Sequence, residues 1–301
     1  MVISDNWAEL LDPGLRKIYD KHLKQYADYL AKIYNVQSSK KAAEYNLGSG
    51  ELGTLDEWTA TGNQVSYEDI NKGYKSTYTH KKYSKGFKVE RELVEDDLYN
   101  EVQKKPRKLA RSVYYTRQIH AASVFNNAFN ASYLGPDAKP LCSASHPTGP
   151  NNTGTTYSNV ATTALDATAV ETDRVNSMGW KDDKGNMLVV NLDTLIVPRN
   201  LRKAALIVAD SDKEPDTSDN NVNVWKGALK VIEWPFLTDS NNWFFADGER
   251  MKEFLNWFDR RKPTLEADRA NFNDESAAWK TVGRWSYGWD DWSWLIGHNV
   301  A

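Results

Sequence analysis

The sequence predicts an α+β protein, and three observations carry that prediction. Apolar residues recur at helical spacing in two segments, one near the N-terminus and one around residues 106–130. Between them, residues 48–86 are rich in Gly, Thr, Tyr and Lys and poor in aliphatic residues, which indicates an extended hairpin. After about residue 160, short strand patterns alternate with helical patterns, so we expect a compact mixed part there.

Composition limits the classes of function. A chain of 301 residues is long enough for about two domains or one elaborated domain, and its 12 Trp predict that much of the burial comes from large aromatic side chains. The net charge of −3 argues against tight binding to the DNA backbone, because such binding needs a basic excess. The single cysteine, Cys142, excludes an intrachain disulfide and a Cys-rich metal site. No signal peptide or membrane span is expected, which favours synthesis in a reducing cytoplasm.

The first element is predicted to be an amphipathic helix of about five turns. Asp12 is its expected cap, Pro13 its first residue, and its apolar stripe runs to Ile33. Basic residues outnumber acidic ones in this region. We interpret them as a solvated face, with contact to DNA or to an acidic scaffold as the alternative.

Residues 48–86 are expected to form an extended hairpin without a core of its own. Ser76, Tyr78 and His80 alternate with Thr77, Thr79 and Lys81 there. In a homo-oligomer, such a segment usually lies on the neighbouring subunit. Residues 48–53 match the glycine pattern of a dinucleotide site, but polar residues lie on both sides of them, so we interpret them as loop glycines.

A strand around Phe87 and Val89 and a short acidic helix over residues 92–100 are expected next. A long helix should then start at Pro106 and end near Asn130, about 37 Å away. The Pro-, Gly- and Asn-rich residues 135–159 are the strongest candidate for a domain boundary.

The second half of the chain is predicted from local signals. Asp166 and Gly179 should bound a helix, and Pro198 should open another. Strands are expected at residues 192–197, 229–234, 243–246 and 279–287, and a polar loop at residues 210–223.

No arrangement of residues indicates catalysis, a metal or a cofactor. Cys142 and His146 are close in sequence, but no orienting third group is identifiable, so we interpret them as loop residues. The five His are scattered, and the pairs Asp182–Asp183 and Asp290–Asp291 are expected in turns or interfaces. The late tryptophans are expected on a sheet face buried against the core or another subunit, with a sugar-stacking platform as the alternative; they are Trp285, Trp289, Trp292 and Trp294.

Six segments occur in an order that resembles a known family. They are FKVERELVEDDLYN, PLCSASHPTG, MGWKDDKGN, LDTLIVPRNLRKAA, VIEWPFLTDSNNWFF and RWSYGWDDWSWLIGHN. Between residues 87 and 299 the chain resembles the major capsid (head) proteins of tailed double-stranded-DNA phages, most closely the branch of the Mu-like major head subunit.

The resemblance implies an α+β capsid fold. Its parts would be an N-terminal arm (residues 1–47), an extended loop (48–86), a peripheral domain (87–160 and 274–301, with a spine helix at 106–130) and an axial domain (161–273). The loop at residues 210–223 would face the axis of the ring.

The implied function is structural and non-enzymatic. Copies of the chain would form hexamers and pentamers of an icosahedral head that encloses double-stranded DNA, in a virion assembled in the cytoplasm of a bacterial host. The implied partners are further copies of the chain, a separate scaffolding protein or none, a portal, and a decoration or cement protein. DNA would be enclosed without sequence-specific binding, and no cofactor, membrane contact or covalent crosslink is expected.

Inter-subunit contacts can be predicted for a few residues. Trp58, on an otherwise polar loop, is expected to anchor in the neighbour, with a local turn clamp as the alternative. Candidates for ion pairs between subunits are Lys72, Lys75, Arg91, Glu92, Glu95 and Asp96.

Two other classes of protein stay open at this point. The first is an encapsulin-like nanocompartment shell, which would share the fold and enclose a protein cargo. The second is a Trp-rich carbohydrate-binding module or glycosidase.

Overall fold

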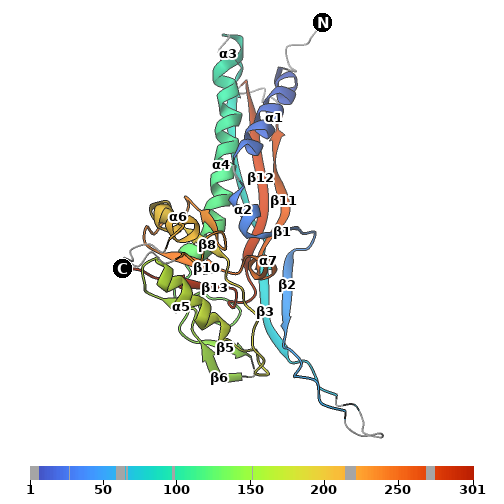
Figure 1. Cartoon of the computed structure of the whole chain (residues 1–301). Helices are drawn as coiled ribbons and strands as arrows, with labels where there is room; N and C mark the ends of the chain where they lie inside the picture. Colours follow the sequence, from blue (N-terminus) through green and yellow to red (C-terminus); the bar gives the residue numbers. More distant parts are fainter. Residues whose placement is uncertain are drawn as a thin grey trace.

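A computed structural model describes residues 7–26, 28–58, 65, 67–96, 99–150, 152–213, 222–268 and 275–301. The molecule has an elongated part made of a long helix and a sheet, a compact part beside one end of it, and a hairpin that projects beyond that end (Figure 1). The mixture of helices and sheets agrees with the predicted α+β class.

The elongated part is built on a four-stranded sheet. Its strand order is β1 (Asn35–Ser38), β11 (Leu255–Ala267), β12 (Ser276–Trp289) and β4 (Lys81–Glu90), and only the β1–β11 pair is parallel. Helices α1 (Trp7–Gln25) and α4 (Tyr99–Asn126) run alongside this sheet (Figure 1).

Alternation along β12 directs one set of side chains toward these helices. The Tyr19 hydroxyl of α1 lies 3.0 Å from the Thr281 hydroxyl, and Trp285 Nε1 donates to His120 Nδ1 of α4 at 3.1 Å. The strand predicted at residues 279–287 is therefore present and is longer, with its tryptophans buried in the chain's own core.

Both long helices begin earlier than predicted. Pro13 lies inside α1 and Pro106 inside α4, so neither proline is the first residue of its helix. Ala8 and Val102, upstream of the two prolines, are buried in the same apolar cluster, and this packing extends the helices backwards. Asp12 does not cap a helix start, because its carboxylate instead binds Arg16 Nε at 2.5 Å.

The predicted helical segments are also divided differently. The five-turn N-terminal helix is two helices, α1 and α2 (Tyr29–Ile33), and Asp28 caps the second by accepting from Ala31 N at 3.2 Å. The helix predicted over residues 92–100 is α3 (Arg91–Glu95) followed by the start of α4, with residues 97–98 outside the described residues. The long helix ends at Asn126, four residues before the predicted end.

The compact part contains a five-stranded sheet. Its order is β7 (Val160–Ala161), β13 (Leu295–His298), β10 (Trp243–Ala246), β8 (Thr194–Val197) and β9 (Lys230–Glu233). Around it lie α5 (Ala167–Met178), η2 (Arg199–Leu201), α6 (Arg202–Asp210) and α7 (Gly248–Phe254). The bounds of α5 are confirmed, because Asp166 caps its start and Gly179 its end.

Strand β10 connects two apolar cores. Phe244 and Ala246 pack in the cluster that includes Phe125 of α4, whereas Trp243 and Phe245 pack in the cluster that includes Val170 of α5. Because alternate residues of a strand point to opposite faces, this one short strand holds the elongated and compact parts together.

The two sheets divide the chain at other residues than the predicted domains. Strand β11 falls in the range predicted for the axial domain but pairs with β12 of the elongated sheet. Strand β13 falls in the range predicted for the peripheral domain but pairs with β10 of the compact sheet. The predicted boundary loop at residues 135–159 contains a hairpin of β5 (His146–Gly149) and β6 (Asn152–Tyr157).

The projecting hairpin consists of β2 (Ala43–Ser49) and β3 (Lys72–Thr79), which pair antiparallel. The predicted alternation is confirmed, since Ser76, Tyr78 and His80 are buried whereas Thr77 and Thr79 are exposed. Tyr78 fastens the hairpin to the body by donating its hydroxyl to Asp290 Oδ1 at 2.5 Å.

Candidate assembly surfaces

Cys142 and His146 do not form a catalytic pair. His146 is fully buried, with Nδ1 2.6 Å from Asp137 Oδ2 and Nε2 3.1 Å from Asn159 Oδ1, and its ring stacks on Trp292. The Cys142 thiol is buried beside Gly297, and burial raises its pKa well above the usual range. A thiol in such surroundings is not a reactive nucleophile.

Neither metal nor membrane chemistry is evident in the described ranges. There, no group of three or more His, Cys, Asp and Glu has the arrangement of a metal site. No helix within the same ranges has the length and apolar character to span a bilayer.

The segment between β2 and β3 exposes an unusual amount of apolar surface. Leu55 is 99% exposed, Tyr67 92% and Trp58 70%. Leu52, Val65 and Ile70 of the same segment are also exposed, as are Tyr45 and Leu47 on the adjoining β2. A concentration of exposed large apolar side chains in one segment marks an interaction site.

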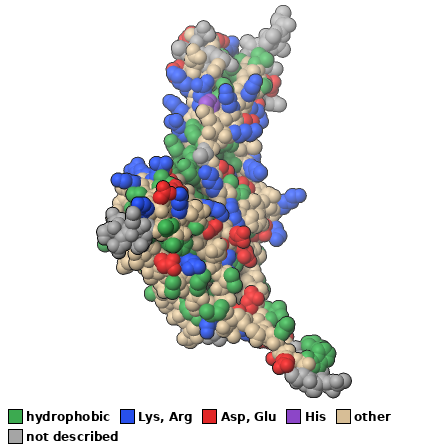
Figure 2. Space-filling model, viewed as in Figure 1, with side chains coloured by type: hydrophobic (Ala, Val, Ile, Leu, Met, Phe, Trp, Pro, Cys, Tyr) green, Lys and Arg blue, Asp and Glu red, His purple; other side chains and the backbone are tan. Residues whose placement is uncertain are grey.

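The charged side chains of this segment are all acidic. Residues 51–70 contain five carboxylates and no Lys or Arg, namely Glu51, Asp56, Glu57, Glu68 and Asp69. Figure 2 shows hydrophobic and acidic side chains on the projecting hairpin, whereas Lys and Arg are numerous along the elongated part. The segment thus presents an apolar and acidic surface, which we call the loop surface (residues 51–58 and 67–70).

The root of the loop is held to the compact part by polar contacts. The Asp183 carboxylate accepts from Glu51 N at 3.1 Å and from Asn71 Nδ2 at 3.0 Å, and Lys184 pairs with Glu68. Burial opposes ionisation of Asp183, but the two hydrogen bonds outweigh it and lower the pKa of this carboxyl. A Cβ on Gly50 would lie 2.5 Å from Asp183 Oδ2, so the close approach requires glycine. The prediction that Asp183 lies in a turn or interface is confirmed by these contacts.

The residues predicted to form ion pairs between subunits lie at two separate places. Lys72 and Lys75 are on β3, where the Lys75 ammonium lies 4.7 Å from the ring centre of Tyr45. The other group is at α3, at the far end of the elongated part (Figure 1). There Arg91 Nε lies 2.6 Å from Glu95 Oε1 of the same chain, and Glu92 and Asp96 are exposed.

Strand β4 carries a surface that the sequence analysis did not single out. It is an edge strand of the elongated sheet, and Lys81, Lys82 and Lys85 are exposed along it. Lysines on an edge strand prevent uncontrolled pairing with other strands. These lysines are visible in the sequence as the run KKYSK, but the sequence does not show that their strand lies at the edge of the sheet.

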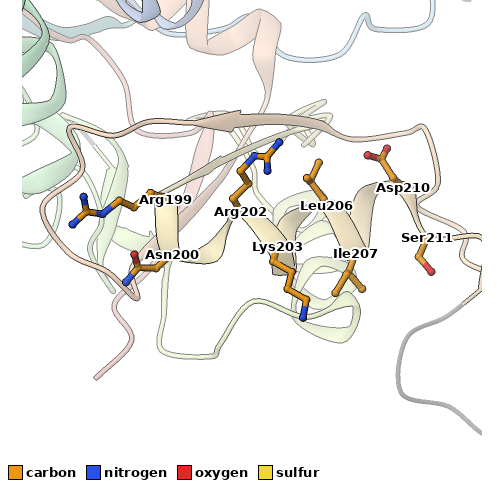
Figure 3. A pocket seen from close by; sticks show the side chains of 8 residues that line it. All are labelled: Arg199, Asn200, Arg202, Lys203, Leu206, Ile207, Asp210 and Ser211. Atoms are coloured by element: carbon orange, nitrogen blue, oxygen red, sulfur yellow. The ribbon is translucent and has the colours of Figure 1, made fainter.

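An open groove of about 580 Å³ follows η2 and α6 on the compact part. Figure 3 shows Arg202 and Leu206 on one side of α6, with Lys203 and Ile207 on the other. Arg202 pairs with Glu233 at 3.0 Å, whereas Lys203 has no acidic partner in the described part of the chain. Of the loop at residues 210–223 that follows α6, residues 214–221 lie outside the described residues.

A family model described as phage capsid protein matches residues 73–296. The chain belongs to this phage capsid protein family. The match includes most strands of both sheets and all helices after β3, so it covers the body of the capsid protein rather than a single motif. A search of curated proteins found no match.

Solved structures share the fold of this capsid protein. The procapsid of bacteriophage JBD30 matches with a TM-score of 0.55 and 15% identity, over 97% of this chain and 74% of that chain. The JBD30 capsid decorated with minor capsid protein trimers gives 0.57 and 15%, over 72% and 93%. A virus-like particle from Pyrococcus furiosus gives 0.54 and 10%, over 95% and 98%. The capsid protein therefore has the tailed-phage capsid fold, and its function is that of a subunit of the capsid shell.

Proposed function

We propose that this capsid protein is the major head subunit of a tailed phage, and that its copies close into hexamers and pentamers around double-stranded DNA. The observation that carries the proposal is the loop surface, which exposes Leu55, Trp58 and Tyr67 on a hairpin without a core. Burial of these side chains on a neighbouring copy would remove a large apolar area from water.

Head-to-tail contact is the geometry that this surface favours. The loop surface is acidic and apolar, whereas the elongated part of the same chain carries many cations. The surface that a copy inserts into its neighbour therefore differs from the surface on which it receives the other neighbour. Such heterologous contacts close into rings when the rotation between copies matches the symmetry. Trp58 is the anchor in this arrangement, and the contacts at Lys72, Lys75 and α3 supplement it. Surface ion pairs are individually weak, so the shell depends on many contacts acting together.

The finer parts of the proposal follow the family resemblance. The chain would belong to the Mu-like branch, with residues 1–47 as an arm, 48–86 as the extended loop, a peripheral domain built on β11 and β12, and an axial domain built on the five-stranded sheet. The partners would be a scaffolding protein, a portal and a decoration protein. The near-neutral charge of −3 supports enclosure of DNA without tight binding to it.

Electron microscopy of the purified protein over a concentration series tests the proposal, first alone and then with the phage's scaffolding protein co-expressed. We expect closed shells in at least the second series. Shells isolated from infected cells are expected to protect double-stranded DNA. Shells that contain a protein cargo and no DNA would favour a nanocompartment instead. A uniform monomer in both series would contradict the shell function. A single band on a denaturing gel of the particles is expected in the absence of a covalent crosslink.

A further inference from the structure

A cleft of about 450 Å³ lies between the long helix and the edge of the elongated sheet. Ser112, Val113 and Thr116 of α4 form one wall. The other walls come from β4, β11 and β12, and consist of Lys82, Tyr83, Ser84, Lys85, Pro263, Thr281, Gly283 and Trp285. We call it the spine cleft.

The spine cleft exists because small residues meet there. Gly283 lies opposite Tyr83 in the register of β12 and β4, and a Cβ on Gly283 would lie 2.3 Å from the Trp285 ring. Ser112 and Thr116 face the same space from the helix, so no long apolar side chain of this chain fills it. The volume is well above the ~150 Å³ that is enough to hold a benzene ring.

The rim of the spine cleft is basic. Lys82 and Lys85 are exposed, and neither ammonium has an acidic partner in the described ranges. A cleft with the partly exposed Tyr83 in its wall and cations at its rim attracts an aromatic side chain flanked by carboxylates, through packing and charge.

The loop surface contains a segment with that chemistry. In Leu55-Asp56-Glu57-Trp58, two carboxylates directly precede a tryptophan that is 70% exposed. This segment belongs to the hairpin that projects from the end of the molecule opposite α3, whereas β4 runs from the base of that hairpin toward α3 (Figure 1). The hairpin thus points away from the spine cleft of its own chain.

We propose that the spine cleft of one copy receives Trp58 of a second copy, with Asp56 and Glu57 of that copy beside Lys82 and Lys85. This inference rests on the proposed shell function and specifies which surface the loop contacts. Every copy donates one loop and accepts another, so the contact propagates around a ring. A buried tryptophan surrounded by charged pairs is the usual composition of a strong interface anchor.

Charge exchange between the two surfaces tests the pairing. In the presence of scaffolding protein, K82E/K85E and D56K/E57K should each slow shell assembly at least about tenfold, measured by light scattering. The four changes combined should restore assembly to within about threefold of the original chain, because the charges are complementary again. The matched control is K17E/K21E, on the exposed face of α1, which should assemble normally.

The outcomes separate this inference from the proposed function. If the original chain and the control form shells and the charge variants do so equally well, or the combined variant stays defective, the spine cleft is not the acceptor, although the shell function stands. Circular dichroism and thermal unfolding of each variant ensure that a defect comes from assembly rather than from folding.

Crosslinking gives a second and independent readout. A variant with E57C and K82C, in which the native Cys142 stays buried, is oxidised after assembly. A disulfide ladder up to pentamers and hexamers on a non-reducing gel is expected. A monomer with an internal disulfide, or no disulfide in well-formed shells, would overturn the proposal.

Discussion

The C-terminal region and the projecting loop both contain tryptophan, and they place it in opposite environments. Trp285, Trp289, Trp292 and Trp294 are at most 6% exposed, whereas Trp58 is 70% exposed. Trp292, like Trp58, directly follows two carboxylates, but it packs against His146 and Trp180, whereas Trp58 lies in a segment with no regular structure. The comparison shows that residue type alone does not decide burial, since the neighbouring residues must form an element that packs.

The sugar-stacking alternative for the C-terminal tryptophans does not agree with this packing. Trp294 donates Nε1 to the Asp291 carbonyl at 2.8 Å and meets Phe125 edge to face, and Trp292 stacks on His146. These rings are part of the chain's own core and offer no open face for a sugar. The carboxylates of Asp290 and Asp291 are likewise committed to contacts within the chain.

The largest expected effect on the isolated subunit is that of Trp294→Ala. Trp294 is fully buried in the cluster that joins α4 to both sheets, so its truncation should cost about 3–5 kcal/mol of unfolding free energy. Urea unfolding measures this loss. A cost below about 1 kcal/mol would mean that this region is not the core of the subunit.

A pH dependence is expected from the same region. Burial, together with the positive charge of Lys81, lowers the pKa of His120 from its usual value of 6.5. The unfolded chain therefore takes up the proton first as the pH falls below 6.5, and the stability that comes from neutral His120 is lost between that pH and the lower pKa of the folded state.

His120→Gln removes the titrating group and keeps an acceptor for Trp285 Nε1. The urea midpoint of the variant should fall less between about pH 7.5 and about pH 5.5 than that of the original chain. His22→Gln, on α1, serves as the control. An equal fall in the original chain and His120→Gln would contradict the assignment.

The root of the loop should respond more weakly. Asp183→Ala removes the acceptor of Glu51 N and Asn71 Nδ2 and should cost about 1 kcal/mol, because the site is partly exposed. Limited proteolysis should cleave residues 51–70 faster in this variant than in Asp20→Ala, which changes an exposed carboxylate of α1. Unchanged cleavage would show that other contacts hold the loop.

The smallest effect on subunit stability is expected from Trp58→Ala, which should stay within about 0.5 kcal/mol of the original chain in urea unfolding. Assembly should nevertheless be lost or strongly slowed, as measured by light scattering with scaffolding protein present. Trp58→Ala is thus expected to impair assembly and spare subunit stability, whereas Trp294→Ala is expected to impair stability. A large loss of stability would instead favour the local turn clamp.

Features that depend on local signals follow from the amino-acid sequence alone. Asp166 and Gly179 bound α5, β10 has the predicted ends, and the alternation that includes Ser76 and Tyr78 indicates the extended strand β3. The order of six segments was enough to indicate the capsid fold. All of these rest on periodicity, caps and motif order, which operate over a few residues or are preserved along the chain.

Features that join distant residues arise from tertiary packing. Val102 and Ala8 extend the two long helices beyond their prolines, and Arg117 of α4 forms a pair of hydrogen bonds, 2.8 and 3.0 Å long, with Asp259 of β11. The spine cleft and the basic edge of β4 depend on which strand lies outermost and which helix covers it. Burial and charge complementarity are properties of surfaces assembled from several segments, so no local pattern contains them.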